Sequence, residues 1–275
     1  MKGGYSMGSP EPDVLVAGRG TAVVLLHGWP HTPYLWHRVT PALSTDHLVI
    51  APDLRNLGEG GADAGAVASS LIRLLDSIDV TSAAVVAIDA GVPAAFLAAV
   101  QHPDRVSRLV LMEGVLPGVE STFSPPWWFG FHAVPGLAES VLPGHEAEYL
   151  GWFLSGPSVR HDIGADAREN FVAAYTGRDA LKVGFEYYRA MGTSGLQIHE
   201  ALAKSRLTAP TLAISGGIVG DAIHAQLVPY ADELAHASVA DCGHLVPLEQ
   251  PAALTATITP FLAAPFLTAV TAPGL

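Results

Sequence analysis

One stretch, residues 83–100, constrains the fold more than any other part of the chain, and it reads AAVVAIDAGVPAAFLAAV. An apolar run typical of a buried strand ends at Asp89, and an alanine-rich run typical of a helix follows at once. Ala87 and Gly91 are small, so strand and helix can approach closely at a strained turn. The pattern is typical of a nucleophile presented at a strand-to-helix turn, although an aspartate can also serve only as a helix N-cap.

The rest of the chain alternates strand-like and helix-like segments on both sides of this turn. Expected strands cover residues 13–17, 21–26, 47–51, 84–88, 108–112, 210–215 and 237–240. Expected helices cover residues 34–43, 64–78, 90–100 and 221–234, with a last helix from Glu249 onward. This alternation predicts an α/β fold with a mostly parallel central sheet flanked by helices.

The alternation stops after the strand that ends at Glu113. Residues 116–205 contain no convincing strand and are rich in tryptophan, tyrosine and phenylalanine, so they are expected to form a mainly helical insertion. The sequence therefore predicts a core made of residues 1–115 and 206–275, with a helical cap, residues 116–205, inserted between its two halves.

Composition excludes several classes of protein. The net charge is −12 with only 14 Lys plus Arg, so nucleic acid is not an expected partner. A single cysteine, Cys242, and a start without an apolar signal region favour a cytoplasmic protein. The most apolar long window, residues 253–270, is interrupted by Pro260 and Pro265, which favours a packed terminal helix over a membrane span.

Four motifs are informative together: His27-Gly28-Trp29-Pro30, the turn at Asp89, the LVLME strand that ends at Glu113, and Asp241-Cys242-Gly243-His244. In this combination the chain resembles the α/β-hydrolase superfamily, in the aspartate-nucleophile branch that holds epoxide hydrolases and haloalkane or haloacetate dehalogenases. The resemblance covers about residues 14–259 and implies an α/β-hydrolase fold with a helical cap. One departure is the short N-terminus, which leaves open whether the family's first strand is present.

The chemistry of a carboxylate at the turn can be argued from residue type. A carboxylate that attacks a carbonyl gives a reactive anhydride, whereas attack on saturated carbon gives a stable alkyl ester. Asp89 therefore favours a substrate with a leaving group on saturated carbon, which means an epoxide or an alkyl halide. Cleavage of the ester by water then needs a base.

The resemblance assigns roles to three further positions. His244 stands where the family carries its catalytic histidine, which activates the water that attacks the Asp89 ester. The backbone N–H groups of Trp29 and Ala90 would form the oxyanion hole.

An acid is needed to orient His244, and the sequence offers two candidates. Glu113 ends the strand after the Asp89 turn, a position that some family members use. Asp221 lies near the position that other members use, but it stands at the expected start of a helix, where capping is its ordinary role. We favour Glu113 and keep Asp221 as the alternative.

The chemistry of the leaving group distinguishes an epoxide hydrolase from a dehalogenase. An epoxide oxygen leaves as an alkoxide and needs an acidic donor, and the family's epoxide hydrolases use two cap tyrosines. Tyr188 resembles the second of these, while Trp128, preceded by Trp127, stands at the place of the first. We expect Tyr188 to donate the proton and Trp127, Trp128 and Tyr187 to bind substrate, although a tryptophan pair in a cap can also serve only in packing.

The sequence matches haloalkane and haloacetate dehalogenases less well. Haloalkane dehalogenases usually carry tryptophan directly after the nucleophile, where this chain has Ala90. Haloacetate dehalogenases hold a carboxylate with arginines near the turn, where this chain has Ala90 and Pro93. A third reading, a non-hydrolytic ligand-binding or biosynthetic protein on the same fold, is disfavoured by the intact nucleophile, histidine and acid candidates.

The tryptophan pair with a tyrosine is similar to epoxide hydrolases of aromatic polyketide pathways, such as those of kinamycin-type angucyclines. That resemblance implies an apolar, polycyclic aromatic epoxide as substrate, because flat indoles suit flat rings. Neither a metal nor another cofactor is expected, and a homodimer is left open.

Overall fold

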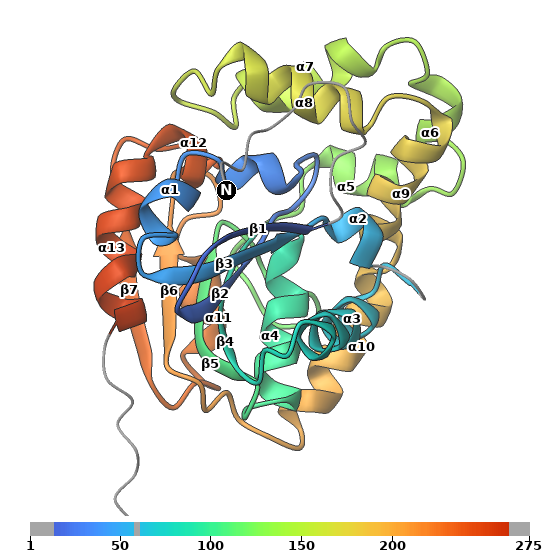
Figure 1. The fold of residues 1–275 in the computed structure, drawn as a ribbon. Helices are drawn as coiled ribbons and strands as arrows, with labels where there is room; N and C mark the ends of the chain where they lie inside the picture. The colour runs from blue at the N-terminus through green and yellow to red at the C-terminus, as the bar shows by residue number, and fades with distance from the viewer. Residues whose placement is uncertain (1–13, 58–60, 264–275) are drawn as a thin grey trace, which may run out of the picture.

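In the part of the chain that the structure describes, seven strands form one sheet, and β1 is the strand there that runs antiparallel to its neighbour. The computed structural model describes residues 14–57 and 61–263, and the order across the sheet is β1-β3-β2-β4-β5-β6-β7 (Figure 1). The strands are β1 Val14–Gly18, β2 Thr21–Leu26, β3 His47–Pro52, β4 Ala83–Ile88, β5 Val106–Met112, β6 Thr211–Ser215 and β7 Leu234–Ser238. The mostly parallel sheet expected from the alternation of segments is confirmed.

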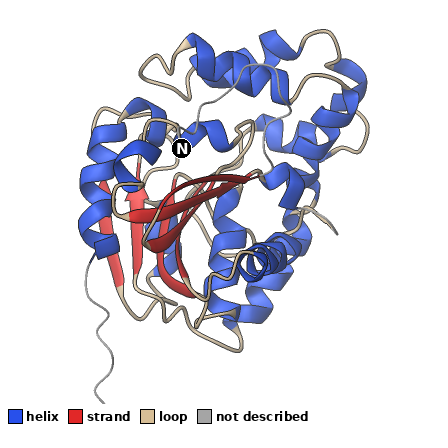
Figure 2. Cartoon of the chain, in the orientation of Figure 1, coloured by secondary structure: helices blue, strands red, loops and turns tan. Residues whose placement is uncertain are grey.

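Helices surround this sheet on both faces (Figure 2). Before β6 and outside the insertion they are the 3₁₀ turn η1 Pro33–Trp36, α1 Thr40–Leu43, α2 Leu54–Leu57, α3 Ala64–Ser77 and α4 Gly91–Gln101. After β6 they are α11 Ala222–Leu227, α12 Val246–Glu249 and α13 Pro251–Ala263. None of the helices in the described ranges combines the length and apolar character that crossing a membrane requires.

The two faces of the sheet bury two separate sets of side chains, because successive strand residues point to opposite faces. In β4, Val85 and Ala87 pack with α3, α4 and α10, whereas Val86 and Ile88 belong to the cluster that includes α13. Every residue of β4 is buried, as expected for a central strand covered on both sides. The strand that presents Asp89 is therefore held rigidly.

Six helices lie between β5 and β6: α5 Trp127–Ala133, α6 Ala138–Val141, α7 Glu146–Ser155, α8 Ala165–Ala174, α9 Arg178–Arg189 and α10 Met191–Leu202. Figure 1 shows α6, α7 and α8 at one end of the molecule, while α10 runs beside α3 and α4, which it contacts. The cluster that includes α13 continues into α7, α8 and α9 through Leu150, Phe171 and Phe185. A division of the chain into core and cap at residues 116 and 205 stays a prediction.

Several expected elements have different bounds. The helix expected over 34–43 is two short pieces, η1 and α1, because Pro41 cannot continue a helix through the preceding turn. The helix expected over 221–234 stops at Leu227, two residues before Pro229, and β7 begins at Leu234 instead of residue 237. The expectations for residues 1–13 and for the chain beyond Ala263 lie outside the described residues.

Candidate active site

Asp89 occupies a tight turn between β4 and α4. Its φ angle is 54°, in the left-handed region that costs energy for a residue with a side chain. A Cβ at Gly91 would lie 2.6 Å from the carbonyl oxygen of His27, and one at Gly28 would lie 2.1 Å from Asp89 Oδ1. The small residues around the turn are thus required by close approach. Ala90, not Asp89, holds the N-cap position of α4, so the capping interpretation of Asp89 is wrong.

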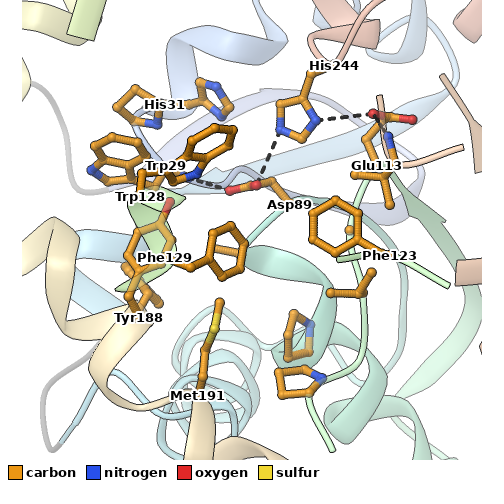
Figure 3. A pocket seen from close by; sticks show the side chains of 18 of the residues that line it. Trp29, His31, Asp89, Glu113, Phe123, Trp128, Phe129, Tyr188, Met191 and His244 are labelled. Atoms are coloured by element: carbon orange, nitrogen blue, oxygen red, sulfur yellow. Dashed lines mark hydrogen bonds and ion pairs between the residues drawn. The ribbon is translucent and has the colours of Figure 1, made fainter. Parts of the chain in front are cut away.

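His244 lies between two carboxylates. Its Nε2 is 3.3 Å from Asp89 Oδ2, and its Nδ1 is 3.2 Å from Glu113 Oε2. Figure 3 shows the three side chains in one line at the carboxyl ends of β4 and β5. An imidazole in this position can hold a proton against both carboxylates or take one from a water beside Asp89.

Asp89 and His244 stabilise each other's charged form. Burial lowers the pKa of His244, but hydrogen bonds and charge from Asp89 and Glu113 outweigh it and raise that pKa to about 10. Burial raises the pKa of Asp89, but His244 and the Ala90 N–H bring it below its ordinary value. Near neutral pH the protein therefore holds an ionised Asp89 beside a protonated His244.

Glu113 is fully buried at the end of β5, with a φ angle of 43°. Its Oε1 accepts hydrogen bonds from the N–H groups of Gly216 at 2.7 Å and Gly220 at 3.3 Å, and its Oε2 accepts one from Val219 at 2.9 Å. These backbone donors, together with His244, provide the hydrogen-bond partners that a buried carboxyl group needs.

The side chain of Asp221 contacts neither Asp89 nor His244. Its Oδ1 accepts a hydrogen bond from Ser215 Oγ at 2.6 Å and lies 3.2 Å from His236 Nε2, and 71% of its side chain is exposed. It holds the expected N-cap position of α11, although its side chain makes no capping hydrogen bond there. Of the two candidates for the orienting acid, Glu113 contacts His244 and Asp221 does not.

The N–H group of Trp29 points at the nucleophile candidate. It donates to Asp89 Oδ1 at 2.8 Å, and the Ala90 N–H also lowers the pKa of the same carboxyl group. The structure therefore brings together the two backbone donors that the sequence placed in an oxyanion hole. Both act on the carboxylate itself, where charge would return in a tetrahedral intermediate.

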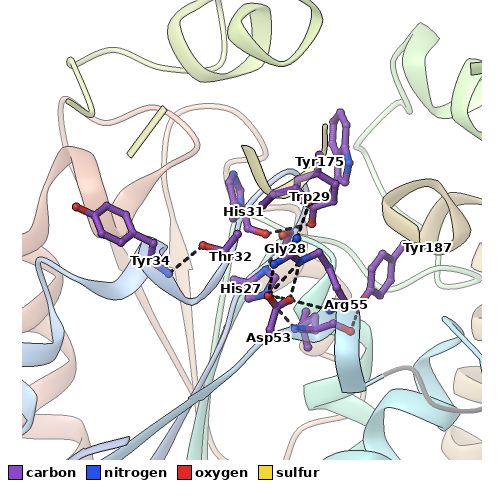
Figure 4. Close-up of polar contacts among 12 residues, drawn as sticks. His27, Gly28, Trp29, His31, Thr32, Tyr34, Asp53, Arg55, Tyr175 and Tyr187 are labelled. Atoms are coloured by element: carbon purple, nitrogen blue, oxygen red, sulfur yellow. Dashed lines mark hydrogen bonds and ion pairs between the residues drawn. The ribbon is translucent and has the colours of Figure 1, made fainter. Parts of the chain in front are cut away.

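A buried polar network fixes the loop that carries Trp29 (Figure 4). His27 Nδ1 donates to the Gly28 carbonyl at 2.8 Å, and its Nε2 lies 3.0 Å from the Leu54 N and 3.4 Å from Asp53 Oδ1. Asp53 pairs with Arg55 at 2.5 Å, and Arg55 also donates to the Ala174 carbonyl of α8 at 2.6 Å. The network thus joins the loop to the inserted helices.

The indole of Trp29 lies directly under α9. A Cβ at Gly184 would be 2.7 Å from two atoms of this indole and 2.7 Å from a ring carbon of Tyr175. Trp29 also packs edge-on against Tyr188, with ring centroids 5.7 Å apart. Helix α9 can approach this closely only because residue 184 is glycine.

A cavity opens at Asp89 between the sheet and the inserted helices, and it is mostly apolar. Its lining contains no lysine or arginine within the described part of the chain, and its carboxylates are Asp89 and Glu113. In Figure 3, Phe129, Tyr188 and Met191 line the side away from His244. Other apolar lining residues come from α3, α4 and the segment after β5: Ala64, Val67, Pro93, Ala94, Val115, Pro117, Phe123 and Pro126.

Three of the four aromatic residues singled out in the sequence line this cavity. Tyr187, Tyr188 and Trp128 do so, and the Tyr187 hydroxyl donates to the Leu54 carbonyl at 2.7 Å. Trp127 does not, since 61% of it is exposed. Trp127 and Trp128 are successive residues of α5 and point about 100° apart, and Trp128 is the one that lies on the cavity side. The expectation that Trp127 binds substrate is therefore wrong.

The hydroxyl group of Tyr188 is available inside the cavity, because it forms no hydrogen bond with the described residues. Burial, and then the nearby charge of Asp89, raise the pKa of Tyr188 well above its usual value. Tyr188 therefore keeps its proton and faces the cavity as a neutral donor.

Sequence reasoning missed His31, which lines the cavity beside Asp89 and His244. It is buried, and desolvation lowers its pKa to about 3, so it is neutral at ordinary pH. Only its position next to Pro30, at the end of the His27 motif, could have drawn attention to it. The described residues contain no cluster of side chains that could hold a metal ion.

Residues 21–251, more than four fifths of the chain, match the sequence profile of a family described as the alpha/beta hydrolase fold. The chain belongs to the α/β-hydrolase family. The α/β-hydrolase fold expected from the four motifs is thereby confirmed.

Individual relatives of this α/β-hydrolase agree with that assignment. The soluble epoxide hydrolase of Corynebacterium sp. (strain C12) is 30% identical over 268 residues, which cover 90% of this chain and 92% of that protein. The crystal structure of Cfl2 from Burkholderia cenocepacia has a TM-score of 0.85 at 31% identity and covers 90% of this chain and 91% of its own. The epoxide hydrolase CorEH has a TM-score of 0.81 at 28% identity, covering 91% of this chain and 94% of its own. Haloalkane dehalogenases are also among the homologues.

Proposed function

We propose that this α/β-hydrolase opens an epoxide to a diol through a covalent alkyl ester on Asp89. The observation that carries the proposal is the juxtaposition of an ionised carboxylate and a neutral tyrosine hydroxyl across one apolar cavity. Asp89 supplies the nucleophile, and Tyr188 supplies the proton that an opening epoxide needs. The likeness to epoxide hydrolases over nine tenths of the chain supports the same reaction.

In the first step, a carboxylate oxygen of Asp89 attacks one epoxide carbon. The carbon–oxygen bond of the ring breaks, and the oxygen takes the proton of Tyr188 as charge develops on it. Trp128 also lines the cavity, and its indole N–H is the second donor that we propose for that oxygen. The protein then carries an ester at Asp89 and a deprotonated Tyr188.

Formation of the ester removes the negative charge that helped to hold the proton on His244. The pKa of His244 then falls, and the proton that it releases returns through solvent to the deprotonated Tyr188, which regains its hydroxyl. His244 is left neutral, with Glu113 holding the proton on Nδ1, so Nε2 is free to act as a base.

In the second step, neutral His244 takes a proton from water as the water oxygen attacks the ester carbonyl. The N–H groups of Trp29 and Ala90 stabilise the oxyanion that forms there, and loss of one such donor typically costs roughly 10²–10³ in rate. The intermediate collapses to the Asp89 carboxylate and the alcohol, which receives the second proton of the water. Asp89 and His244 return to their starting ionic states.

The cavity lining supports a substrate that carries no charge. An anionic substrate such as a haloacid would bury its carboxylate beside Asp89 without a lysine or arginine in the described lining to pair with it. The aromatic side chains of Phe123, Trp128 and Phe129 suit a flat ring system. We therefore propose an apolar aromatic epoxide as the substrate class, with a polycyclic natural-product intermediate as the narrower form.

A haloalkane dehalogenase using the same ester is the alternative, and the homologues of that activity favour it. It needs no proton donor, because a halide leaves as a stable anion. The free hydroxyl of Tyr188 has no task in that reaction.

The test is to trap the ester. The His244→Gln variant, incubated with aromatic epoxides that the wild type turns over, should accumulate an adduct, and peptide mapping by mass spectrometry should place it on Asp89. A single turnover of the wild type in H₂¹⁸O should leave the label in Asp89, because water attacks the carbonyl carbon. An adduct on another residue, or no adduct with a true substrate, would overturn the proposal.

A further inference from the structure

Glu249 is a buried carboxylate for which the proposed reaction has no direct use. It ends α12, and only 8% of it is exposed. Its side chain forms no ion pair with another side chain in the described part of the chain. Four backbone N–H groups satisfy it instead, from two segments that lie far apart in the sequence.

One of these segments carries the proposed base. Glu249 Oε2 accepts from the Gly243 N–H and Oε1 accepts from the Leu245 N–H, each at 2.9 Å. The N–H of His244 itself donates to the Ser158 carbonyl at 2.7 Å. Three consecutive N–H groups are therefore fixed, and the outer two depend on one side chain.

The other segment belongs to the inserted helices, between α7 and α8. Oε2 of Glu249 also accepts from the N–H of Arg160 at 2.7 Å and from that of His161 at 3.1 Å. The same segment supplies the Ser158 carbonyl. Glu249 thus ties the His244 loop to the segment that already receives the His244 N–H.

The loop that carries His244 is closely packed at Gly243. A Cβ at Gly243 would lie 2.5 Å from the Ser158 carbonyl oxygen and 2.8 Å from Glu249 Oε1. The backbone at Gly243 is therefore packed closely against both the Ser158 carbonyl and the Glu249 side chain. A small displacement there would move the imidazole out of the line between Asp89 and Glu113.

We propose that Glu249 is a positioning residue for the hydrolytic base, and this rests on the proposed function of His244. Its carboxylate holds the His244 backbone so that Nε2 faces Asp89 while Nδ1 faces Glu113. Only a group that accepts through both oxygens can fill this place, because each of its four hydrogen-bond partners is a backbone N–H donor. An amide of the same shape would turn an NH₂ group toward at least one backbone N–H.

The role predicts an effect on one step only. Alkylation of Asp89 uses the carboxylate and Tyr188, whereas hydrolysis of the ester uses a correctly placed His244. The Glu249→Gln variant should therefore alkylate at close to the wild-type rate and hydrolyse the ester slowly. Loss of hydrogen bonds to a charged group predicts a hydrolysis step slower by about 10- to 100-fold, with the ester accumulating on Asp89.

A matched control is available in the same chain. Glu146 in α7 is also buried, and it accepts backbone hydrogen bonds from Gly144 at 2.8 Å and Gly177 at 2.9 Å. It contacts neither His244 nor its loop. The Glu146→Gln variant makes the same chemical change to a backbone-bound glutamate, and it should leave the ratio of the two rates as in the wild type.

The experiment measures single-turnover alkylation and hydrolysis for the wild type, Glu249→Gln and Glu146→Gln, with intact-protein mass spectrometry to follow the ester. Slow hydrolysis and ester accumulation in Glu249→Gln alone support the inference. Equal slowing of both steps, or no change in their ratio, overturns it. If His244→Gln forms no ester on Asp89, the proposed function itself has failed, which is a different result.

A second variant covers the case in which Glu249→Gln does not fold. Glu249→Asp keeps the charge but shortens the side chain by one methylene, so it cannot reach both segments at once. It should accumulate the ester to a smaller extent than His244→Gln does. A wild-type ratio of the two rates in Glu249→Asp, with Glu249→Gln unfolded, would assign the residue to folding alone and overturn the inference.

Discussion

The contact between Glu113 and His244 leads to a prediction that separates the two candidate acids. In the Glu113→Gln variant the side chain keeps its shape, but it has only one acceptor oxygen. In the wild type the surrounding donors are shared between two oxygens, Oε1 and Oε2. Either His244 Nδ1 or the Gly216 N–H must then face an NH₂ group. The imidazole loses its fixed tautomer in one case, and the loop after β6 loses its anchor in the other.

The size of the effect follows from these contacts. A hydrogen bond to a charged group contributes about 1.5–3 kcal/mol. Since about 1.4 kcal/mol corresponds to a factor of ten in rate, losing the bond to His244 slows hydrolysis by roughly 10- to 150-fold. Loss of the correct tautomer can raise the cost toward about 10⁴. Asp221→Asn should change hydrolysis by less than about threefold, because the Asp221 side chain is mostly exposed and bonds to Ser215 and His236 instead of His244.

The assay is single-turnover hydrolysis of the ester, after mixing each variant with an epoxide in less than one equivalent. Circular dichroism and thermal unfolding check that each variant is folded. Alkylation of Asp89, measured in the same samples, should fall less than hydrolysis in Glu113→Gln. A larger loss from Asp221→Asn than from Glu113→Gln, in folded proteins, would refute the assignment of the acid.

Three further predictions concern the cavity and the ionic states. Tyr188→Phe should slow alkylation by an epoxide by roughly 10²-fold or more in stopped-flow measurements, and Trp128→Phe should slow it less. Near-normal alkylation in Tyr188→Phe, with bromide release from a brominated substrate, would instead identify a dehalogenase. Trp127→Phe should leave both steps unchanged in the same assay, because its indole lies outside the cavity. Alkylation should be independent of pH between about 6.5 and 9, since the pKa of His244 is about 10 in the free protein. Hydrolysis should rise with pH through a lower pKa, because the ester removes the Asp89 charge; a hydrolysis profile that rises only near pH 10 would contradict this.

The local features of the site could be predicted from the sequence because each depends on neighbours in the chain. The small residue Gly91 and the apolar run before Asp89 specify a strand, a turn and a helix without reference to the rest of the molecule. The end of a buried strand placed Glu113 at the same edge of the sheet as Asp89, since parallel neighbouring strands end together. The contact of Glu113 with His244 joins residues 131 positions apart, and only the family resemblance predicts it.

Features that depend on tertiary packing could not be predicted in this way. The sequence does not indicate which of Trp127 and Trp128 faces the cavity. The packing of α5 against the rest of the protein determines that it is Trp128. His31 is neutral because of burial that no local pattern reports. The contacts of Glu249 join residues almost ninety positions apart, so its place beside the His244 loop is visible only in the folded chain.

The contact between Gly184 and Trp29 couples the packing of an inserted helix to the proposed oxyanion site. The indole that packs against α9 and the N–H that donates to Asp89 Oδ1 belong to the same residue. A larger residue at position 184 would therefore disturb the residue that is proposed to stabilise the oxyanion, although Gly184 itself does not line the cavity.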